Sequence, residues 1–470
     1  MALLRVLPLS LPTLDLPVLL DALPPGPGQF VLESGASGPA AVRRHTFVGA
    51  EPFMTLVTHG REAYVHEPGG TRVMNEDPFT VLQSLLDRCR MTTDHGRPGQ
   101  PPGAAVGYLS YDLGRRVERL PATARDDLGM PEVQMGFYDV MVAIDHETGE
   151  ATLLIGAPDG REAEAAAKAA RWARALKAAA PPAAAPAAPP APGKAVSSLT
   201  RAAYRDAVNR ALTYIGAGDI FQVNLAQRFS CPWSGTGRDL YHRLRQVSPA
   251  PFSAYLELGS WQVVSCSPER LIAVDGRRIE TRPIKGTRPR GDSAVADQAA
   301  AAELLASEKD QAELTMTVDL MRNDLGRVCE FGSVTVPDLR RLEATPSVWH
   351  TVATVEGRLR SDVTSADVLR AVFPGGSITG APKVRAMAII EELEPVRRGV
   401  YTGAIGYIGF DGRMDFNIAI RTAVVGGGKA YFHAGGAIVA DSDPSAEYAE
   451  TIAKAAGLAL ALGVSLDDLP

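Results

Sequence analysis

Residues 178–192 consist only of alanine and proline, and this segment limits how the rest of the chain can fold. Proline fixes the backbone φ angle and has no N–H donor, so such a run cannot join a sheet or continue a helix. We therefore predict a semi-rigid linker at residues 178–196. It separates an N-terminal region, residues 1–177, from a second region, residues 197–465. Length alone allows two or three domains, or one intertwined unit.

The composition excludes several classes of protein. With 46% hydrophobic and 22% charged residues, the chain is typical of a soluble globular protein rather than a collagen-like, coiled-coil or disordered one. The net charge of -6 argues against general binding to nucleic acid or a membrane surface. No uninterrupted apolar run reaches the roughly 20 residues of a membrane span. The apolar start is broken by three prolines and an aspartate, which indicates a strand and loop rather than a signal peptide.

The 4 cysteines show neither paired spacing nor histidines at metal-binding spacing, which indicates reduced, mostly buried thiols in a cytoplasmic protein. Strand-like stretches come first in the second region, two long helical stretches follow, and strands then return before a last helix at 444–462. This order predicts an α+β fold of large antiparallel sheets with helices on the outer faces. The other helices are expected at 162–177, from Thr200 to 216, and around 296–321 and 382–397.

Two predicted helices carry carboxylates on one face. Asp310 and Glu313 are spaced i, i+3 on the first, and Glu447, Glu450 and Lys454 share a face of the last. Two such faces brought together would repel each other unless a divalent cation lay between them. Oxygen ligands without thiolates or clustered histidines favour Mg²⁺ over zinc. The alternative is two unrelated solvated faces.

A glycine pair and a serine-containing turn are candidates for binding an anion. Gly435 and Gly436 precede the last helix, where a ligand can approach free backbone N–H groups closely. The segment PGGSITGAPK lacks the Gly-Lys-Ser/Thr ending of a nucleotide-binding loop. A turn that presents Ser377 to a small carboxylate suits it better.

The chemistry of the site centres on a lysine and a glutamate. Lys285 lies in TRPIKGTRPR, between prolines, where partial desolvation would lower its pKa and make it a nucleophile or base. The alternative is a basic loop that binds phosphate or nothing. Glu269, in SPER, is a candidate general acid or base, or one half of a structural Glu–Arg pair. His350, in an apolar strand, is more typical of a core residue.

Taken in order, several motifs resemble the chorismate-utilising enzymes, which include the anthranilate, aminodeoxychorismate, isochorismate and salicylate synthases. The motifs are GDIFQVNLAQRF, SPERL, RPIKGT, KDQAELTMTVDLMRND, FPGGSITGAPKVRAM, IAIRTA and AGGAIVADSDPSAEYAET. The resemblance covers about residues 200–462 and extends more loosely to VLESGA and GYLSYDLGR. It implies a sandwich-like core of antiparallel sheets and chorismate as the substrate.

The resemblance also assigns roles to residues of this chain. It implies that Glu313 and Glu450 bind Mg²⁺, with Glu447 and Asp310 in support. The residues implied to contact the substrate are Gln222, His350, Ser377, Tyr401, Arg421, Gly435, Gly436 and Lys454. Glu33 and Ser34, in VLES, resemble a tryptophan-binding segment of the family.

Two positions discriminate between branches of the family. Isochorismate- and salicylate-forming members carry lysine where this chain has Gln222, and glutamine cannot activate a water molecule. Anthranilate-forming members carry alanine at the position of Lys285, whereas members that form 4-amino-4-deoxychorismate carry lysine. Asn224, in QVNL, also favours the latter branch.

The resemblance therefore implies amination of chorismate at C4, toward para-aminobenzoate and folate. A covalent bond to Lys285 would form on the way, with Glu269 as general acid, and a separate glutamine amidotransferase subunit would supply the ammonia. The alternatives are an anthranilate-forming or dual-purpose enzyme, and an inactive binding or regulatory subunit of the same fold.

Overall fold

The structure is a computed structural model that describes residues 3–34, 44–92, 99–158, 160–179, 193–346, 348–467 and 469. Most of the predicted linker lies outside these residues. Its last part, however, forms the short strands β11 (Gly193–Lys194) and β12 (Val196–Ser197). Strand β11 pairs in parallel with β26 (Val464–Ser465), and β12 joins a large antiparallel sheet, so the linker ends earlier than predicted.

The first large sheet has the order β1-β10-β9-β3-β2-β14-β15-β24-β25-β13-β12, with β21 against β13. Five of its strands come from the N-terminal region: β1 (Leu3–Leu9), β2 (Phe30–Glu33), β3 (His45–Gly49), β9 (Val140–Asp145) and β10 (Glu150–Ala157). The others are β13 (Gln222–Pro232), β14 (Phe252–Glu257), β15 (Gln262–Ser267), β21 (Gly380–Ala381), β24 (Thr422–Gly426) and β25 (Lys429–Ile438). The two parts meet where β2 pairs with β14.

The second large sheet has the order β18-β20-β17-β16-β23-β22-β7-β8-β4-β5-β6, with β19 against β20. Its N-terminal strands are β4 (Met54–His59), β5 (Glu62–Glu67), β6 (Gly70–Asn75), β7 (Ala104–Leu109) and β8 (Val133–Tyr138). The others are β16 (Arg270–Asp275), β17 (Arg278–Arg282), β18 (Ile284–Pro289), β19 (Thr335–Ala344), β20 (Val348–Arg358), β22 (Ala404–Gly409) and β23 (Met414–Ile418). Here β7 pairs with β22, so both regions of the chain build both sheets.

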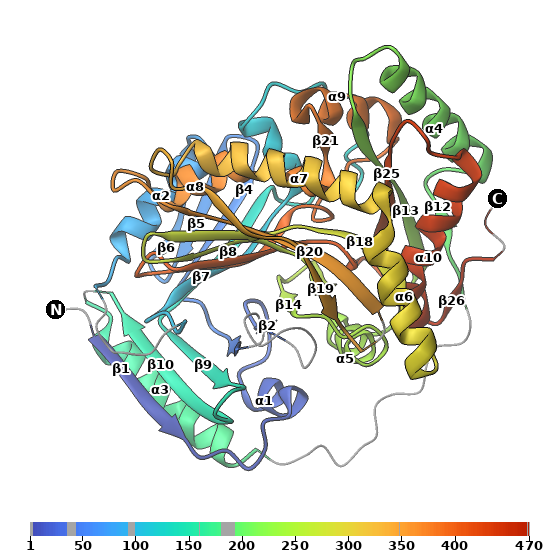
Figure 1. The fold of residues 1–470 in the computed structure, drawn as a ribbon. Helices are drawn as coiled ribbons and strands as arrows, with labels where there is room; N and C mark the ends of the chain where they lie inside the picture. The colour runs from blue at the N-terminus through green and yellow to red at the C-terminus, as the bar shows by residue number, and fades with distance from the viewer. Residues whose placement is uncertain are drawn as a thin grey trace.

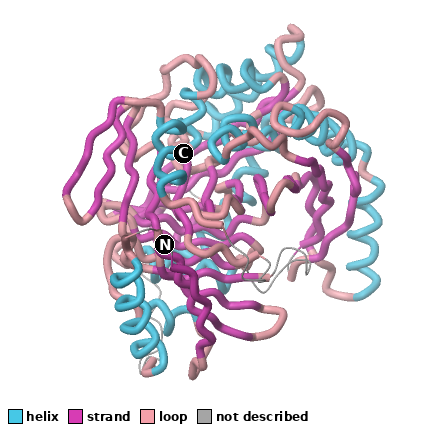
Figure 2. The backbone as a smooth tube through the Cα atoms, turned by 90° about the vertical axis from the view of Figure 1, so that its left-hand side faces the viewer, coloured by secondary structure: helices cyan, strands magenta, loops and turns pink. Residues whose placement is uncertain are grey.

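The two sheets enclose one layer of the core, which confirms the predicted α+β fold with a sandwich-like centre. Phe30 and Phe47 of the first sheet pack with Tyr108 and Tyr138 of the second, and all four are buried. Burial of such large apolar surfaces is the main favourable term in folding. Figure 2 shows the strands through the middle of the molecule and helices along its outside.

Helices cover the outer faces of both sheets (Figure 1). Those packed on the first sheet are α1 (Leu16–Ala22), α3 (Glu162–Lys177), α5 (Gly237–Val247) and α10 (Pro444–Leu462). Those packed on the second are α2 (Pro78–Arg88), α6 (Ala294–Ala306) and α7 (Glu308–Gly326), with α8 (Ser365–Val372) beside α2 and α7. Helices α4 (Arg201–Gly216) and α9 (Lys383–Leu393) pack against β13. In the described part of the chain, no helix is long and apolar enough to cross a membrane.

Local sequence signals explain both the confirmed and the missed helices. Thr200 caps α4 as predicted, because its hydroxyl accepts a hydrogen bond from the Ala203 N–H. The single helix expected at 296–321 is wrong: it breaks at Ser307, whose hydroxyl caps α7 through the Asp310 N–H. Helix α5 was missed, although Thr236 and Asp239 form a reciprocal capping box at its start. All 4 cysteines are free and buried, as expected.

Candidate active site

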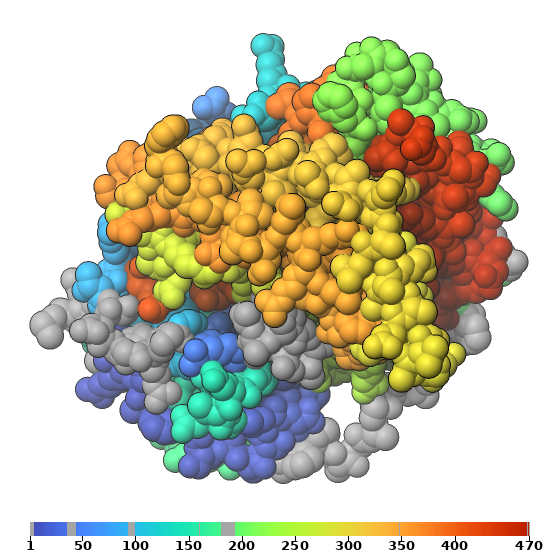
Figure 3. Space-filling view, in the orientation of Figure 1, coloured from blue at the N-terminus to red at the C-terminus, as the bar shows by residue number. Residues whose placement is uncertain are grey.

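A cavity of about 780 Å³ opens between α7 and α10 and reaches strands of both sheets. Figure 3 shows the yellow α6–α7 segment directly beside the red C-terminal helix on this side of the molecule. The cavity brings together most of the residues that the sequence singled out. These are Glu269, Lys285, Asp310, Glu313, His350, Ser377, Tyr401, Arg421, Gly435, Glu450 and Lys454.

Lys285, on β18, projects its amine into this cavity. Its Nζ donates a hydrogen bond to the backbone carbonyl oxygen of Ser377 at 3.1 Å. The same oxygen accepts a second hydrogen bond from Asn224 Nδ2 at 3.0 Å. Burial lowers the pKa of Lys285, although the nearby carboxylates of Glu313 and Glu269 oppose this. The amine is therefore deprotonated more readily than an exposed lysine, as a nucleophile requires.

Glu269 lies in the turn between β15 and β16 and is only 5% exposed. Its Oε1 accepts a hydrogen bond from the Ile284 N–H at 3.4 Å, which places the carboxyl group next to the lysine-bearing strand. The turn is fixed by Ser267, whose hydroxyl donates to the Ile418 carbonyl at 2.6 Å. Burial raises the pKa of Glu269, so its carboxyl group holds a proton more strongly than usual and suits a general acid.

Three glutamates face one another across α7 and α10. Burial raises the pKa of Glu313 and of Glu447, and the charge of Glu450 adds to both. Burial would also raise the pKa of Glu450, but nearby lysines outweigh it, and Lys454 Nζ lies 2.6 Å from Glu450 Oε1. Three lysines, Lys285, Lys309 and Lys454, lie close enough to these glutamates to oppose the rise in pKa.

The backbone at Gly436 leaves room for these carboxylates. A Cβ atom on this glycine would lie 3.1 Å from Glu447 Oε2 and 3.3 Å from Glu450 Oε1. Glu447 Oε1 accepts a hydrogen bond from the Ser442 hydroxyl at 2.6 Å, whereas its Oε2 is buried with no hydrogen-bond partner. An unpaired, buried carboxylate oxygen is costly unless a cation or donor meets it. Gly436 and Glu447 support the wall from behind rather than line the cavity.

This donor set fits a hard divalent cation. All donors are carboxylate oxygens, the ligands that Mg²⁺ prefers. Among the described residues, no three histidine, cysteine, aspartate or glutamate side chains already converge as a complete metal site. Asp310 also has a partner in the protein, because Arg288 Nη2 donates to its Oδ2 at 3.1 Å.

The opposite end of the cavity is cationic. Arg421 has an unusual positive φ of 49° and is largely buried, which lowers the pKa of its guanidinium group. None of the carboxylates in the described ranges forms an ion pair with it. A buried, unpaired guanidinium group facing a cavity is a strong anion-binding feature. Tyr401 lies nearby, and burial raises its pKa to about 12, so its phenol keeps the proton that it can donate.

His350 lies on β20 as predicted, with its ring both buried and on the cavity wall. Its Nδ1 is 2.8 Å from the Thr287 hydroxyl. Burial lowers its pKa to about 4, and the charge of Arg421 adds to this, so the imidazole is neutral near pH 7. A neutral ring beside the substrate can donate or accept one hydrogen bond without adding charge.

Three predicted residues lie elsewhere. Gln222 begins β13 with a buried side chain and is not among the residues that line this cavity. Its backbone pairs with Ala381 of β21. Glu33 and Ser34 line a separate cavity of about 440 Å³ between the two sheets. There the Glu33 carboxylate accepts hydrogen bonds from the Tyr241 hydroxyl at 2.6 Å and from Arg245 at 2.7 and 2.8 Å.

Three residues in or next to the site were not singled out from the sequence: Lys309, Arg398 and Glu394. Lys309 lines the cavity and lies four residues before Glu313, a spacing that could have identified it. Arg398 and Glu394 form a buried ion pair at 2.7 Å, and Arg398 also donates to the carbonyl oxygens of Ile378 and Asn224. This pair ties the Ser377 turn to β13.

Comparisons with known proteins agree with this geometry. The sequence pattern of the chorismate binding enzymes matches residues 38–459. The chain is 42% identical over 429 residues to aminodeoxychorismate synthase component 1 of Escherichia coli (strain K12), covering 91% of this chain and 92% of that protein. It is 43% identical over 434 residues to anthranilate synthase component 1 of Thermus thermophilus, covering 92% and 91%.

A solved structure is also similar. Anthranilate synthase component I from Streptococcus pneumoniae matches with a TM-score of 0.78 at 32% identity, over 88% of this chain and 92% of that one. Both the sequence match and the fold extend over nearly the whole length. The chain belongs to the family of chorismate binding enzymes.

Proposed function

We propose that this protein is a component 1 enzyme that converts chorismate and ammonia to 4-amino-4-deoxychorismate. The similarity to aminodeoxychorismate and anthranilate synthases is nearly equal, so overall identity does not separate the two activities. The observation that carries the proposal is the position of Lys285, whose partly buried amine is held on the cavity wall beside Glu269. Amination at C2, as in anthranilate formation, has no need of this lysine.

The lysine divides a difficult substitution into two easier ones. In the first step the neutral Lys285 amine bonds to C2 of chorismate, the ring double bonds shift, and the C4 hydroxyl leaves as water with a proton from Glu269. In the second step ammonia bonds to C4, the double bonds shift back, and the C2–N bond to Lys285 breaks. Glu269 regains a proton from the incoming ammonia. The balance is chorismate plus ammonia giving 4-amino-4-deoxychorismate plus water.

The remaining groups bind and orient the ring. Arg421 and Tyr401 would hold one carboxylate of chorismate at the cationic end of the cavity. Glu313 and Glu450, with Glu447 behind them, would hold Mg²⁺ at the other end. When bound, Mg²⁺ would supply charge neutralisation and a fixed contact for the second carboxylate. Lys454, which donates to the Gly435 carbonyl at 3.1 Å, keeps the backbone there in place.

We further propose that the ammonia comes from a glutamine amidotransferase partner and that the complex works in the cytoplasm. The component 1 names of the relatives support a partner component. The separate cavity at Glu33 and Ser34 is proposed to bind tryptophan, as the VLES segment suggests. Tryptophan would then raise the melting temperature, and the absence of any shift at millimolar tryptophan would contradict this assignment.

Product analysis tests the proposed function. The full chain is incubated with chorismate, Mg²⁺ and an ammonium salt, and products are separated before and after addition of an aminodeoxychorismate lyase. We expect para-aminobenzoate only with the lyase, little anthranilate, and loss of amination in Lys285→Ala but not in Lys429→Ala, an exposed lysine on β25. Anthranilate and pyruvate as the sole products would contradict the proposal.

A further inference from the structure

The segment GYLSYDLGR, residues 107–115, belongs to the N-terminal region, yet its middle lies against a loop of the active site. It runs from β7 into the short 3₁₀ helix η2 (Tyr111–Arg116). The loop is residues 397–403, between α9 and β22, and it carries Tyr401 on the wall of the active-site cavity. We call it the Tyr401 loop. Residues 110–112 are not among those that line the cavity, so any effect of theirs on the substrate passes through neighbouring residues.

Three hydrogen bonds join this segment to Gly399 in the Tyr401 loop. The Gly399 N–H donates to Asp112 Oδ2 at 2.9 Å. The Gly399 carbonyl oxygen accepts from the Ser110 hydroxyl at 2.9 Å and from the Tyr111 N–H at 2.8 Å. Gly399 has a positive φ of 59°, a conformation that glycine adopts most easily, so the backbone turns sharply here. The direction in which the chain continues to Tyr401 therefore depends on these contacts.

The far end of the Tyr401 loop lies against the same segment. A Cβ atom on Gly403 would overlap the Leu109 carbonyl oxygen and would lie 2.9 Å from the Tyr111 backbone nitrogen. The next residue of the chain begins β22, which pairs with β7. The loop is thus fixed to the N-terminal region at both Gly399 and Gly403, and Tyr401 lies between these two points.

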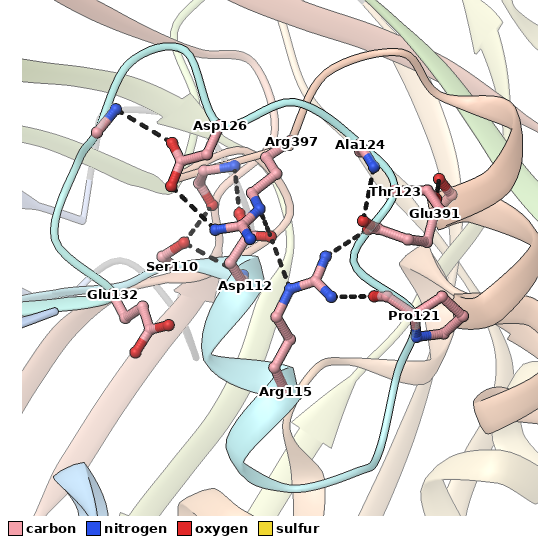
Figure 4. Close-up of polar contacts among 12 residues, drawn as sticks. Ser110, Asp112, Arg115, Pro121, Thr123, Ala124, Asp126, Glu132, Glu391 and Arg397 are labelled. Carbon is pink, nitrogen blue, oxygen red and sulfur yellow. Dashed lines mark hydrogen bonds and ion pairs between the residues drawn. The ribbon is translucent and has the colours of Figure 1, made fainter. Parts of the chain in front are cut away.

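Charged groups hold the Asp112 carboxylate beside the start of the loop. Figure 4 shows it between the guanidinium groups of Arg115 and Arg397, whose Nε atoms lie 3.6 and 4.0 Å from Asp112 Oδ1. Arg397 is itself fixed by the N-terminal region. Its backbone N–H donates to the Arg125 carbonyl oxygen at 3.0 Å, and its Nη1 donates to Asp126 Oδ2 at 2.9 Å. The carboxylate that accepts from Gly399 is therefore itself held in place by opposite charges.

The Tyr401 hydroxyl is the donor that this loop leaves free for a substrate. Arg398 also lines the cavity, but all five of its N–H bonds have partners in the protein. These partners are the Glu394 carboxylate, the Thr402 hydroxyl and the carbonyl oxygens of Ile378 and Asn224. The Tyr401 hydroxyl, in contrast, has no hydrogen-bond partner among the described residues.

We infer that Asp112 is a positioning residue for chorismate: by holding Gly399 it sets the place of the Tyr401 phenol, which binds a carboxylate of the substrate. This inference rests on the proposed function, which assigns Tyr401 to the substrate. It gives the N-terminal region a role in the reaction although Asp112 itself does not line the cavity.

A double-mutant cycle between the two residues tests the inference in steady-state assays. We expect Tyr401→Phe to raise the KM for chorismate about tenfold, as the loss of a hydrogen bond to a charged group would. Asp112→Ala should raise it at least about threefold and leave kcat nearly unchanged. In the double variant, Asp112→Ala should add less than about twofold, because its effect passes through the phenol. Asp112→Asn keeps an oxygen for the Gly399 N–H and should restore part of the wild-type KM.

Asp77 provides a matched control in the N-terminal region. Its carboxylate also accepts from backbone N–H groups, those of Phe79 and Thr80, and pairs with Arg370. Asp77→Ala should lower the melting temperature but leave the KM for chorismate unchanged. Should Asp112→Ala fail to fold, Ser110→Ala takes its place in the cycle, since it removes the hydroxyl that donates to the Gly399 carbonyl.

The outcomes separate this inference from the proposed function. If the wild-type chain forms no C4-aminated product, the proposed function is wrong and this inference goes with it. If the wild-type chain aminates chorismate at C4 but Tyr401→Phe keeps the wild-type KM, only the inference is wrong. It is also wrong if Asp112→Ala keeps the wild-type KM, or if the effects of the two substitutions multiply in the double variant.

Discussion

Lys285 Nζ donates a hydrogen bond to the backbone carbonyl oxygen of Ser377 at 3.1 Å, and this contact fixes the amine in the cavity. A neutral amine has two N–H bonds and one lone pair. Because the contact uses an N–H bond, the lone pair stays free for the substrate. The accepting carbonyl is itself positioned by Asn224, so the position of the amine depends on three separate segments.

Loss of the unpaired guanidinium group at the cationic end should weaken substrate binding. A hydrogen bond to a charged group contributes about 1.5–3 kcal/mol, which corresponds to about a 10- to 100-fold change in affinity. We expect Arg421→Met to raise the KM for chorismate by that factor in steady-state assays. Arg322→Met, at an exposed arginine of α7, is the control. An unchanged KM in Arg421→Met would show that Arg421 does not bind the substrate.

The activity should depend on pH through Lys285 and Glu269. Attack requires neutral Lys285, whose pKa burial lowers, and proton donation requires neutral Glu269, whose pKa burial raises. The fraction of neutral lysine grows with pH, and the fraction of protonated glutamate falls. Therefore kcat/KM for chorismate should rise up to the lower pKa and decline above the higher one. The measurement holds the concentration of uncharged ammonia constant. Glu269→Gln should lower kcat/KM for chorismate by about 100-fold or more. A profile without either limb would contradict these roles.

A methyl group at Gly436 should disturb the carboxylates more than the chorismate pocket. The added carbon would lie 3.1–3.3 Å from Glu447 and Glu450 oxygens, closer than ordinary contact. We expect Gly436→Ala to raise the Mg²⁺ concentration for half-maximal activity about tenfold, equivalent to about 1.4 kcal/mol. Gly216→Ala, where an added Cβ has no neighbour within 4 Å, is the control. If both variants needed the same Mg²⁺ concentration for half-maximal activity, that result would contradict metal binding by Glu447 and Glu450.

The two regions of the chain should assemble even when they are not joined. The β2–β14 and β7–β22 pairings place strands of both regions in each large sheet. We expect residues 1–179 and 193–470, produced together as separate chains, to copurify as one active complex. If each fragment instead purified alone as a folded monomer, that result would contradict the finding that both regions contribute strands to each large sheet.

Signals close together in sequence predicted local structure well. Helix α10 begins and ends as expected because Asp443 caps its first turn, Pro444 starts it, and Gly463 ends it in the left-handed conformation. Lys285, Glu269, Glu313 and Glu450 were also expected at one site, and the cavity brings them together.

Contacts between distant segments could not be predicted in this way. The spacing on α7 predicted Asp310 as a supporting metal ligand, but it could not show that Arg288 on β18 donates to its Oδ2. Gln222 was expected near the substrate from the resemblance to the family, and it does not line the cavity.

The most direct test of the central claim is the mass of the protein after incubation with chorismate and Mg²⁺ without ammonia. We predict a covalent adduct equal to chorismate minus one water, located on the peptide that contains Lys285 and lost when ammonium is added. The adduct should be absent from Lys285→Ala. No adduct in a wild-type preparation that still aminates chorismate at C4, or an adduct on another residue, would contradict the role of Lys285 as the nucleophile.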